Sequence, residues 1–597
     1  NLIEHEPSNF GVAGSSPAGR ASLRQLRHGH DSATIAGEAS KRPAGRSAIR
    51  ARLALLLTIG LLAAPLQAQV PGAIGRSASA PAASTPRIDA TGARPVLIVD
   101  GAPFTMLAAQ ANNSSNYPAM LPKVWPVLER LGANTLEIPV AWEQIEPVEG
   151  RFDFRWLEAL LAEARGRDKR LVLLWFATWK NTSPSYAPAW VKLDNRRFPR
   201  MKTREGADHY ALSPMHTATL EADRRAFVAL MTWLRDHDPQ HTVIMVQVEN
   251  EPGSYRNPRD YSASANAEFA NGVPAELARA LGKPRGSWAS LFGKQAERAF
   301  QTWHMARFIG AVAAAGKAVK PLPMYANAAL ADPFAEPDPM GVASGGPQRD
   351  MIAVWKAAAP AIDFVAPDIY DRDARKVAAW LDAYARPDNA LMVPEIGNSS
   401  EYARLFWPAL GRGAIGFAPF GMDATGYANF PLGAKVLDDA ALEAFAVKYR
   451  AFADVASVWP RLAATRPLWG AAKGEDGAPQ TAAMGTWKVT ASYGEWQFGF
   501  KEWSWLKSEP PPSAAEPVGG AVVMQLSDSE FLVSGDHVRV SFTSEDAKAL
   551  VVRVEEGRFN GPGHWQMRRV WNGDQIDYGL NFTATPVWLK VTVGRYR

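Results

Sequence analysis

The chain has 597 residues, of which 47% are hydrophobic and 21% are charged, and it contains no cysteine. This length predicts two or three globular domains. The absence of cysteine excludes disulfide and thiolate chemistry. The ten histidines form no HExxH motif, so we expect neither a catalytic metal nor another cofactor.

The formal net charge of +5 is unevenly distributed along the chain. Residues 1–68 contain eight Lys/Arg and four Asp/Glu, which leaves 57 basic and 56 acidic residues in the remainder. The main body of the chain is therefore nearly neutral, which argues against a nucleic-acid partner.

The amino-terminal region resembles a secretory signal. Arg46, Arg50 and Arg52 precede the apolar run 53–64, and Leu66-Gln67-Ala68 follows as a cleavage site. This pattern predicts a signal peptide over residues 46–68 and a periplasmic or secreted bacterial protein. The alternative is an amino-terminal membrane anchor, for which the apolar stretch is short.

The segments around this signal are expected to lie outside the folded domains. Residues 1–45 are polar and contain no Met, so we interpret them as an untranslated upstream or disordered segment. The Ala/Ser/Pro/Gly composition after residue 68 predicts a linker and lead-in over residues 69–99. No later segment is long and apolar enough to span a membrane.

Residues 100–470 alternate apolar runs with helical patterns, which is typical of βα units on a parallel sheet. The helical patterns include 156–165, 220–237, 295–315 and 374–385. The predicted strands number eight: 105–109, 134–140, 171–177, 243–248, 323–327, 364–369, 391–395 and 414–420. The expected fold class is therefore α/β, a (β/α)8 TIM barrel. A doubly wound sheet would need a glycine-rich turn after its first strand, and residues 110–115 contain no glycine.

Two of these strands end in carboxylates. The run 243–248 continues into Glu249, Asn250 and Glu251 before a Pro-Gly turn, and Glu395 closes the run 391–395. The carboxyl ends of barrel strands form the rim where active sites lie. Retaining glycoside hydrolysis needs two carboxyl groups about 5–5.5 Å apart on such a rim, so Glu251 and Glu395 are candidate catalytic residues.

The pattern leaves several assignments open. Strict alternation would place Asn250 and Glu251 on opposite faces, so both face the rim only if the strand bulges or ends there. Glu249 is interpreted as a buried partner for an arginine. Asp368 and Glu143 are the alternatives to Glu395 as nucleophile, and either could instead bind sugar hydroxyls.

Two segments resemble a known enzyme family. Residues 246–255, read VQVENEPGSY, resemble the acid/base motif of glycoside hydrolase family 35, the retaining β-galactosidases. Residues 142–154 resemble the W-x3-E-P-x2-G-x-F-D-F segment that families 35 and 42 share. The resemblance implies that Glu251 is the acid/base, that Glu395 is the nucleophile, and that Asn250 contacts the sugar 2-hydroxyl. Pro252 replaces the family's usual tyrosine, a departure that concerns the donor sugar more than the reaction class.

These roles carry electrostatic requirements. The acid/base must be protonated near neutral pH, so we expect partial burial and the charge of Glu395 to raise the pKa of Glu251. The nucleophile needs hydrogen-bond donors, and Tyr370 at the end of the sixth strand is the candidate donor. The alternative for Tyr370 is an aromatic residue that packs at the rim.

Further side chains are candidates for substrate binding. Aromatic rings could stack on sugar faces, and amides could bind hydroxyls; core packing and loop capping are the alternatives. The aromatic candidates are Trp142, Trp179, Tyr325 and Trp407, and the amide candidates are Asn112 and Asn327.

Residues 471–597 change to a strand-like pattern, which predicts a β-rich accessory domain resembling a sandwich. The predicted strands are 487–490, 495–500, 521–525, 531–533, 538–542, 550–555, 566–571 and 588–593. We expect this domain to cover barrel surface, or else to bind carbohydrate.

The sequence thus predicts a secreted retaining glycoside hydrolase. By the resemblance it is a β-galactosidase that releases terminal β-galactosyl residues from plant-derived oligo- or polysaccharides by double displacement. The alternatives are another retaining specificity, such as a β-glucosidase or an arabinoside-directed enzyme, or a non-catalytic sugar-binding protein. The expected partner is a carbohydrate, a β-galactoside, and the oligomeric state stays open.

Overall fold

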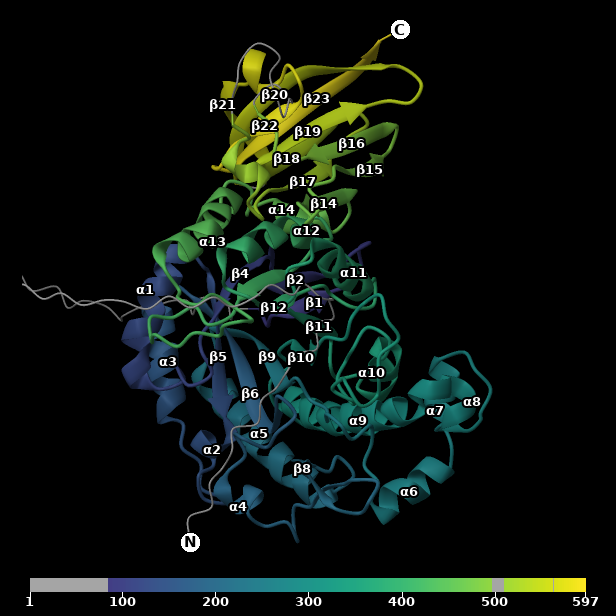
Figure 1. Ribbon diagram of the computed structural model, residues 1–597. Coiled ribbons are helices and arrows are strands. Elements are labelled where there is room, and N and C mark those ends of the chain that lie inside the picture. The colour runs from purple at the N-terminus through teal and green to yellow at the C-terminus, as the bar shows by residue number, and fades with distance from the viewer. Residues whose placement is uncertain (1–83, 497–508, 562, 597) are drawn as a thin grey trace, which may run out of the picture. The chain divides into compact units, whose positions relative to one another are not determined.

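The computed structural model describes residues 84–496, 509–561 and 563–596 (Figure 1). The segments predicted over residues 1–45 and 46–68, and the first part of the predicted linker, lie outside the described residues. Within the described ranges, no helix has the length and apolar character needed to cross a membrane.

Eight parallel strands close into a barrel in chain order (Figure 1). The barrel strands are β4 Met106–Gln110, β5 Thr135–Ala141, β6 Arg170–Lys180, β9 Val243–Asn250, β10 Met324–Ala329, β11 Phe364–Ile369, β12 Val393–Ile396 and β13 Gly416–Pro419. Each overlaps the strand expected at its place. The (β/α)8 prediction is therefore confirmed, and β13 pairs with β4 to complete the ring.

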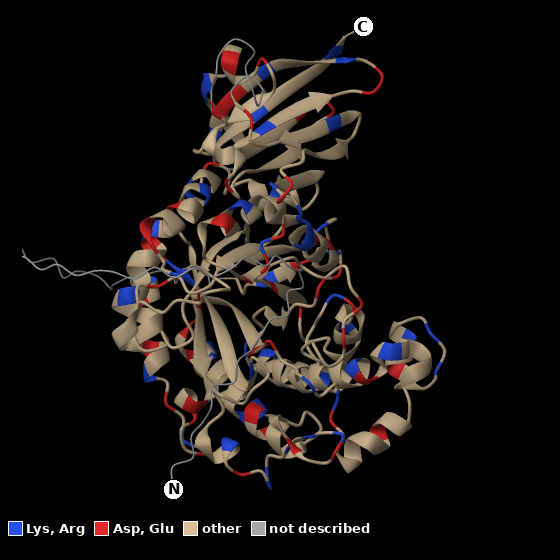
Figure 2. Cartoon of the chain, viewed as in Figure 1, with Lys and Arg blue, Asp and Glu red and all other residues tan. Residues whose placement is uncertain are grey.

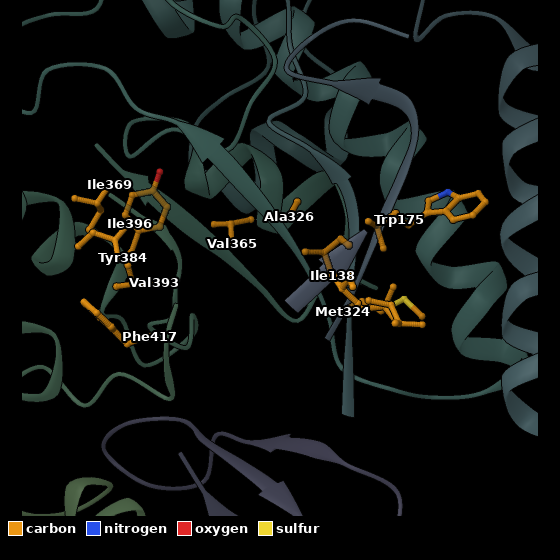
Figure 3. Close-up of a cluster of buried hydrophobic side chains, with 14 of the residues drawn as sticks. Ile138, Trp175, Met324, Ala326, Val365, Ile369, Tyr384, Val393, Ile396 and Phe417 are labelled. Carbon is orange, nitrogen blue, oxygen red and sulfur yellow. The ribbon is translucent and has the colours of Figure 1, made fainter. Parts of the chain in front are cut away.

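The barrel strands are apolar because both of their faces are buried. All eight residues of β9 are buried, including the polar ones at its end. Alternate side chains fill the interior, where Val172, Leu174 and Phe364 belong to one buried cluster. The outward side chains pack under the helices, and Figure 3 shows part of this layer around Ile138, Met324 and Val365.

A helix follows each barrel strand. These helices are α1 Leu121–Leu131, α3 Arg155–Gly166, α5 Thr217–His237, α9 Ala296–Val319, α10 Ile352–Ala358, α11 Ala374–Tyr384, α12 Phe406–Leu410 and α13 Asp439–Phe452. Local signals set their ends. The side chain of Asp438 accepts from the backbone N–H of Ala441 at the start of α13, and Gly132, in the left-handed conformation, ends α1.

The loops after the barrel strands carry the remaining short elements. Those in the barrel half are α2 Trp142–Ile145, α4 Ala189–Lys192, β7 Arg200–Lys202, β8 Asp208–Leu212, α6 Ala263–Ala270, α7 Ala275–Ala280, α8 Trp288–Phe292 and α14 Trp459–Ala463, with 3-10 turns at Pro118–Met120, Gly293–Gln295 and Ser400–Leu405. Four of them (α6, α7, α8 and the turn Gly293–Gln295) lie between β9 and α9, and three (α4, β7 and β8) lie between β6 and α5. The longest insertions therefore follow the neighbouring strands β6 and β9.

A small antiparallel sheet precedes the barrel. It consists of β1 Arg87–Asp89, β2 Val96–Val99 and β3 Ala102–Phe104. Leu97 and Val99 of β2 share the buried cluster of the barrel interior. Residues 69–99 were expected to be a linker and lead-in, but β1 and β2 lie inside this stretch. They form strands because apolar residues of β2 pack against the apolar end of the barrel.

The carboxy-terminal part of the chain, from Leu468 onward, forms two antiparallel sheets. One contains β14 Leu468–Ala472, β17 Gly520–Gln525, β18 Glu530–Asp536, β23 Val587–Tyr596, β20 Lys548–Asn560 and β21 His564–Val570. The other contains β15 Gln480–Met484, β16 Trp487–Ser492, β19 Val538–Thr543 and β22 Leu580–Phe582. Side chains of both sheets, such as Val489 and Val591, share one core. The predicted sandwich-like domain is confirmed.

The sequence patterns missed β14, β15 and β22, and placed a strand over 495–500 whose last four residues lie outside the described part of the chain. Two 3-10 turns, Pro512–Ala514 and Gly573–Gln575, complete the domain. A cavity of about 580 Å³ lies beside Arg404, Lys473 and Tyr493, away from the carboxylates of the barrel. In the view of Figure 2, Lys and Arg residues alternate with Asp and Glu residues along the described parts of the chain.

Candidate active site

The end of β9 turns both Asn250 and Glu251 toward the barrel axis. Glu249 and Glu251 have backbone φ of 63° and 43°, and such left-handed conformations break the alternation of a regular strand. The side-chain amide of Asn250 reaches Glu395 on β12. The irregular strand end that the sequence required is therefore present.

A bulge in β6 stabilises this irregular end. Trp175 pairs with Val248 and Lys180 with Asn250, so five steps along β6 oppose two along β9. The bulge leaves the N–H groups of Thr178 and Trp179 without strand partners, and both donate to the carboxylate of Glu249, at 3.3 and 2.7 Å. Glu249 thereby points away from Glu395, toward Asp223 of α5.

Glu249 was expected to pair with an arginine, and this expectation is wrong. Its partners are two backbone N–H groups and the carboxyl of Asp223. Asp223 in turn accepts from Trp175 Nε1 at 2.9 Å and from the hydroxyl of Thr178 at 2.5 Å. Burial raises the pKa of Glu249 well above its ordinary value, and the neighbouring Asp223 adds to the shift.

Three side chains, each from a different barrel strand or the residue directly after one, donate hydrogen bonds to Glu395. Tyr370, directly after β11, donates its hydroxyl to Oε2 at 2.7 Å. Gln110 of β4 and Asn250 of β9 donate their amides to Oε1 at 3.1 and 3.2 Å. Glu395 is only 4% exposed, and three donors of this kind stabilise a buried carboxylate. The hydrogen bond expected from Tyr370 is confirmed.

Glu251 has a different environment from Glu395. Its side chain is half-buried, and its backbone N–H donates to Asn327 Oδ1 at 2.9 Å. Burial and the charge of Glu395 raise its pKa to about 7, against smaller lowering effects of Lys180 and of a hydrogen bond with Asp368. The expected rise in the pKa of Glu251, with its two expected causes, is confirmed.

Asp368 and Lys180 complete the group at the carboxyl ends of the strands. Asp368 of β11 stands opposite Glu395 in the β11–β12 register, and it accepts from Asn327 Nδ2 at 2.7 Å. Lys180 is 6% exposed; its Nζ donates to Asn181 Oδ1 at 2.5 Å and lies 5.0 Å from the ring centroid of Phe176. Glu251, Glu395 and Asp368 thus lie together at the rim, and the ammonium group of Lys180 interacts with two of them, Glu251 and Asp368.

Four aromatic candidates cannot stack on a sugar, because each is fully buried. Trp142 donates to Glu146 and packs edge-on against Trp190. Trp179 donates to the carbonyl of Leu212 on the outer side of the β6 bulge. The hydroxyl of Tyr325 donates to Glu137 inside the barrel. The indole N–H of Trp407 donates to Asp536 of β18.

Two polar candidates are engaged elsewhere on the rim. Glu143 accepts from Lys192 Nζ at 2.8 Å. Asn112 holds Asp423 through its backbone N–H and its amide, at 2.8 and 2.9 Å. These contacts favour loop capping for Asn112, whereas Asn250, Asn327 and Tyr370 belong to the network of Glu251 and Glu395.

Sequence reasoning did not single out Gln110 or Lys180 as site residues. Both are the last residues of barrel strands, so the rule that rim residues close a strand would have included them. Lys180 was missed because β6 extends three residues beyond its predicted end at residue 177. Among the described residues, no group of three or more acidic, His or Cys side chains is arranged to hold a metal ion.

Two family models match parts of the chain. Residues 121–308 match the glycoside hydrolase family 42 model, described as β-galactosidase. Residues 445–583 match a domain of unknown function, DUF5597. No protein of curated function matches the chain.

Several solved structures align with part of the chain at low identity. The β-galactosidase of Rahnella sp. R3 aligns over 58% of this chain and 55% of its own, at 15% identity and a TM-score of 0.41. The β-galactosidase of Marinomonas ef1 aligns over 58% and 59%, at 12% identity and a TM-score of 0.41. The catalytic domain of a Paenibacillus polymyxa β-amylase aligns over 57% of this chain and 97% of its own, at 13% identity and a TM-score of 0.41. The chain thus spans little more than half of the two β-galactosidases.

Residues 121–308, which include barrel strands β5, β6 and β9, are thus similar to the β-galactosidases of glycoside hydrolase family 42. The more specific expectation of family 35 is not supported, because the model that matches the barrel is that of family 42. The segment over residues 142–154, which the two families share, lies inside the matched region.

Proposed function

We propose that this chain is a retaining β-galactosidase in which Glu251 is the acid/base and Glu395 the nucleophile. The observation that carries the proposal is the contrast between the two carboxyl groups. Glu395 accepts three hydrogen bonds from Tyr370, Gln110 and Asn250, whereas burial and charge raise the pKa of Glu251 to about 7. Pairs of carboxyl groups whose environments differ in this way divide into acid and nucleophile.

The first step forms a covalent intermediate. A carboxylate oxygen of Glu395 bonds to the anomeric carbon while the bond from that carbon to the glycosidic oxygen breaks. Glu251 transfers its proton to the departing oxygen, so the leaving group departs as an alcohol. Tyr370, Gln110 and Asn250 hold Glu395 in the orientation that this attack requires.

The second step releases the sugar. Glu251, now a carboxylate, takes a proton from water as the water oxygen bonds to the anomeric carbon and the bond to Glu395 breaks. Formation of the ester to Glu395 removes a neighbouring negative charge, which lowers the pKa of Glu251 and suits it to act as a base. Two inversions give net retention at the anomeric carbon.

The donor sugar is proposed as β-galactose, by the description of the matching family model and the resemblance of residues 246–255. We propose terminal galactosyl residues of plant-derived oligo- or polysaccharides as the natural substrates. Fold alone does not decide the sugar, so β-glucosides and arabinosides belong in the same assay.

The test is hydrolysis of p-nitrophenyl glycosides, with product anomers followed by NMR, for the wild type and for the Glu251→Gln and Glu395→Gln variants. We expect β-galactosidase activity with initial release of β-galactose, and losses of several orders of magnitude in both variants. Full activity in either variant would remove that residue from the mechanism. Calorimetric binding of galactosides without turnover would instead favour a non-catalytic sugar-binding protein.

We also propose that the protein is exported to the periplasm or the medium, on the basis of the signal-like residues 46–68. Fractionation of cells that express the full chain, with amino-terminal sequencing of the product, tests this. Full-length protein confined to the cytoplasm would contradict it.

A further inference from the structure

Asn327 ties the acid/base to a third carboxyl group. It lies near the end of β10 and is fully buried. Its Oδ1 accepts from the backbone N–H of Glu251 at 2.9 Å, and its Nδ2 donates to Asp368 Oδ2 at 2.7 Å. One amide therefore fixes both the position of Glu251 and the orientation of the Asp368 carboxyl.

Asp368 faces both catalytic residues. It stands opposite Glu395 in the parallel register of β11 and β12, and its carboxyl hydrogen-bonds the carboxyl of Glu251. The amide of Asn327 donates a hydrogen bond to Oδ2 of Asp368. The other oxygen of Asp368, Oδ1, is buried and has no amide, hydroxyl or ammonium donor. Two carboxyl groups can form a hydrogen bond only if one of them carries a proton.

The surroundings favour a proton on Asp368. Asp368 is 3% exposed, compared with a half-buried Glu251. Burial, followed by the charges of Glu395 and Glu251, raises the pKa of Asp368 well above its ordinary value, and these effects outweigh the opposing charge of Lys180. The titratable groups around it are Glu251 after β9, Glu395 of β12, Lys180 of β6, Tyr325 of β10, Tyr370 after β11 and Tyr384 of α11.

We propose that Asp368 is a positioning residue that stays protonated and donates a hydrogen bond to the carboxyl of Glu251, with Asn327 holding both groups. This inference rests on the proposed function of Glu251. Asp368 keeps its proton through both steps of the reaction. Its hydrogen bond strengthens when Glu251 has transferred its own proton to the leaving group, because the acceptor is then a carboxylate.

The proposal predicts the direction in which two substitutions move the pH profile. In Asp368→Asn, the amide can accept from Asn327 and still donate to Glu251, so the basic limb of kcat/KM should stay at its wild-type position. In Asp368→Ala the donor is lost, so the pKa of Glu251 rises and the limb moves to higher pH. If Asp368 were ionised instead, both substitutions would remove a negative charge and move the limb to lower pH, by about 1 unit or more.

A second measurement does not depend on activity. The infrared difference spectrum between the wild type and Asp368→Asn near pH 7 should contain the carbonyl band of a protonated carboxylic acid. Carboxylate bands in its place would overturn the proposal. Because this readout needs no turnover, a protonated Asp368 in a protein that hydrolyses no glycoside would contradict only the proposed function.

Discussion

The hydroxyl of Tyr370 lies 2.7 Å from Oε2 of Glu395 and donates a hydrogen bond to it. Tyr370 directly follows β11 and Glu395 is the third of the four residues of β12, so two neighbouring strands present donor and acceptor to each other. Burial and the charge of Glu395 raise the pKa of Tyr370 well above its ordinary value. The phenol therefore remains a donor over the whole working pH range.

Substitution of Tyr370 by Phe removes this donor from a buried carboxylate. A hydrogen bond to a charged group contributes about 1.5–3 kcal/mol, so we expect kcat on aryl β-galactosides to fall about 10- to 100-fold. Tyr449→Phe is the matched control, since its buried hydroxyl donates to the carbonyls of Ala108 and Phe417. That control should lower the melting temperature and leave kcat near the wild-type value; equal kcat losses in both variants would contradict the role of Tyr370.

The pH profile should report the protonation of Glu251. Its pKa is raised to about 7, and the reaction needs the protonated form, so kcat/KM should be highest below this pH and fall as pH rises through it. With a substrate whose leaving group needs no proton, such as a dinitrophenyl galactoside, Glu251→Gln should retain the glycosylation step and lose this basic limb. A basic limb that persists unchanged in Glu251→Gln would assign it to another group.

The charge of Lys180 should affect the pH at which the basic limb of kcat/KM lies. Its ammonium group lowers the pKa of Glu251, so Lys180→Met should raise it and move the basic limb of kcat/KM to higher pH, by up to about 1 unit. Lys192→Met provides the control, because this lysine pairs with Glu143 at 2.8 Å. A shift of the same size in both variants would show that general surface charge, and not Lys180, is responsible.

Much of the barrel was predictable because its strands are buried on both faces and appear as continuous apolar runs. The end of such a run also marks the rim, which is how Glu251, Glu395 and Tyr370 were found. The short strands β14, β15 and β22 were missed because they are weakly apolar or only three to five residues long. Their stability comes from cross-strand partners far away in the chain.

The direction of individual side chains was harder to predict. The bulge in β6 turns Trp179 outward and brings Lys180 to the rim, and no periodicity in residues 170–180 indicates it. Glu249 has no arginine partner because the same bulge supplies two free N–H groups. The placement of Tyr325 and Trp407 depends on Glu137 and Asp536, which are distant in sequence.

The buried pair of Glu249 and Asp223 makes a prediction about stability. Burial raises the pKa of both groups in the folded protein, above about 4.3 for Glu in the unfolded chain. The folded state therefore binds more protons than the unfolded state above that pH, so the contribution of the pair to the free energy of unfolding decreases as pH rises toward the folded pKa.

Glu249→Gln is neutral at every pH and can still accept from the N–H of Trp179. We expect its melting temperature, followed by circular dichroism between about pH 5 and pH 8, to fall less steeply with pH than that of the wild type. Glu443→Gln, at a surface pair with Arg450, should keep the wild-type slope. Parallel curves for the wild type and Glu249→Gln would mean that the pair is not protonated in the folded protein.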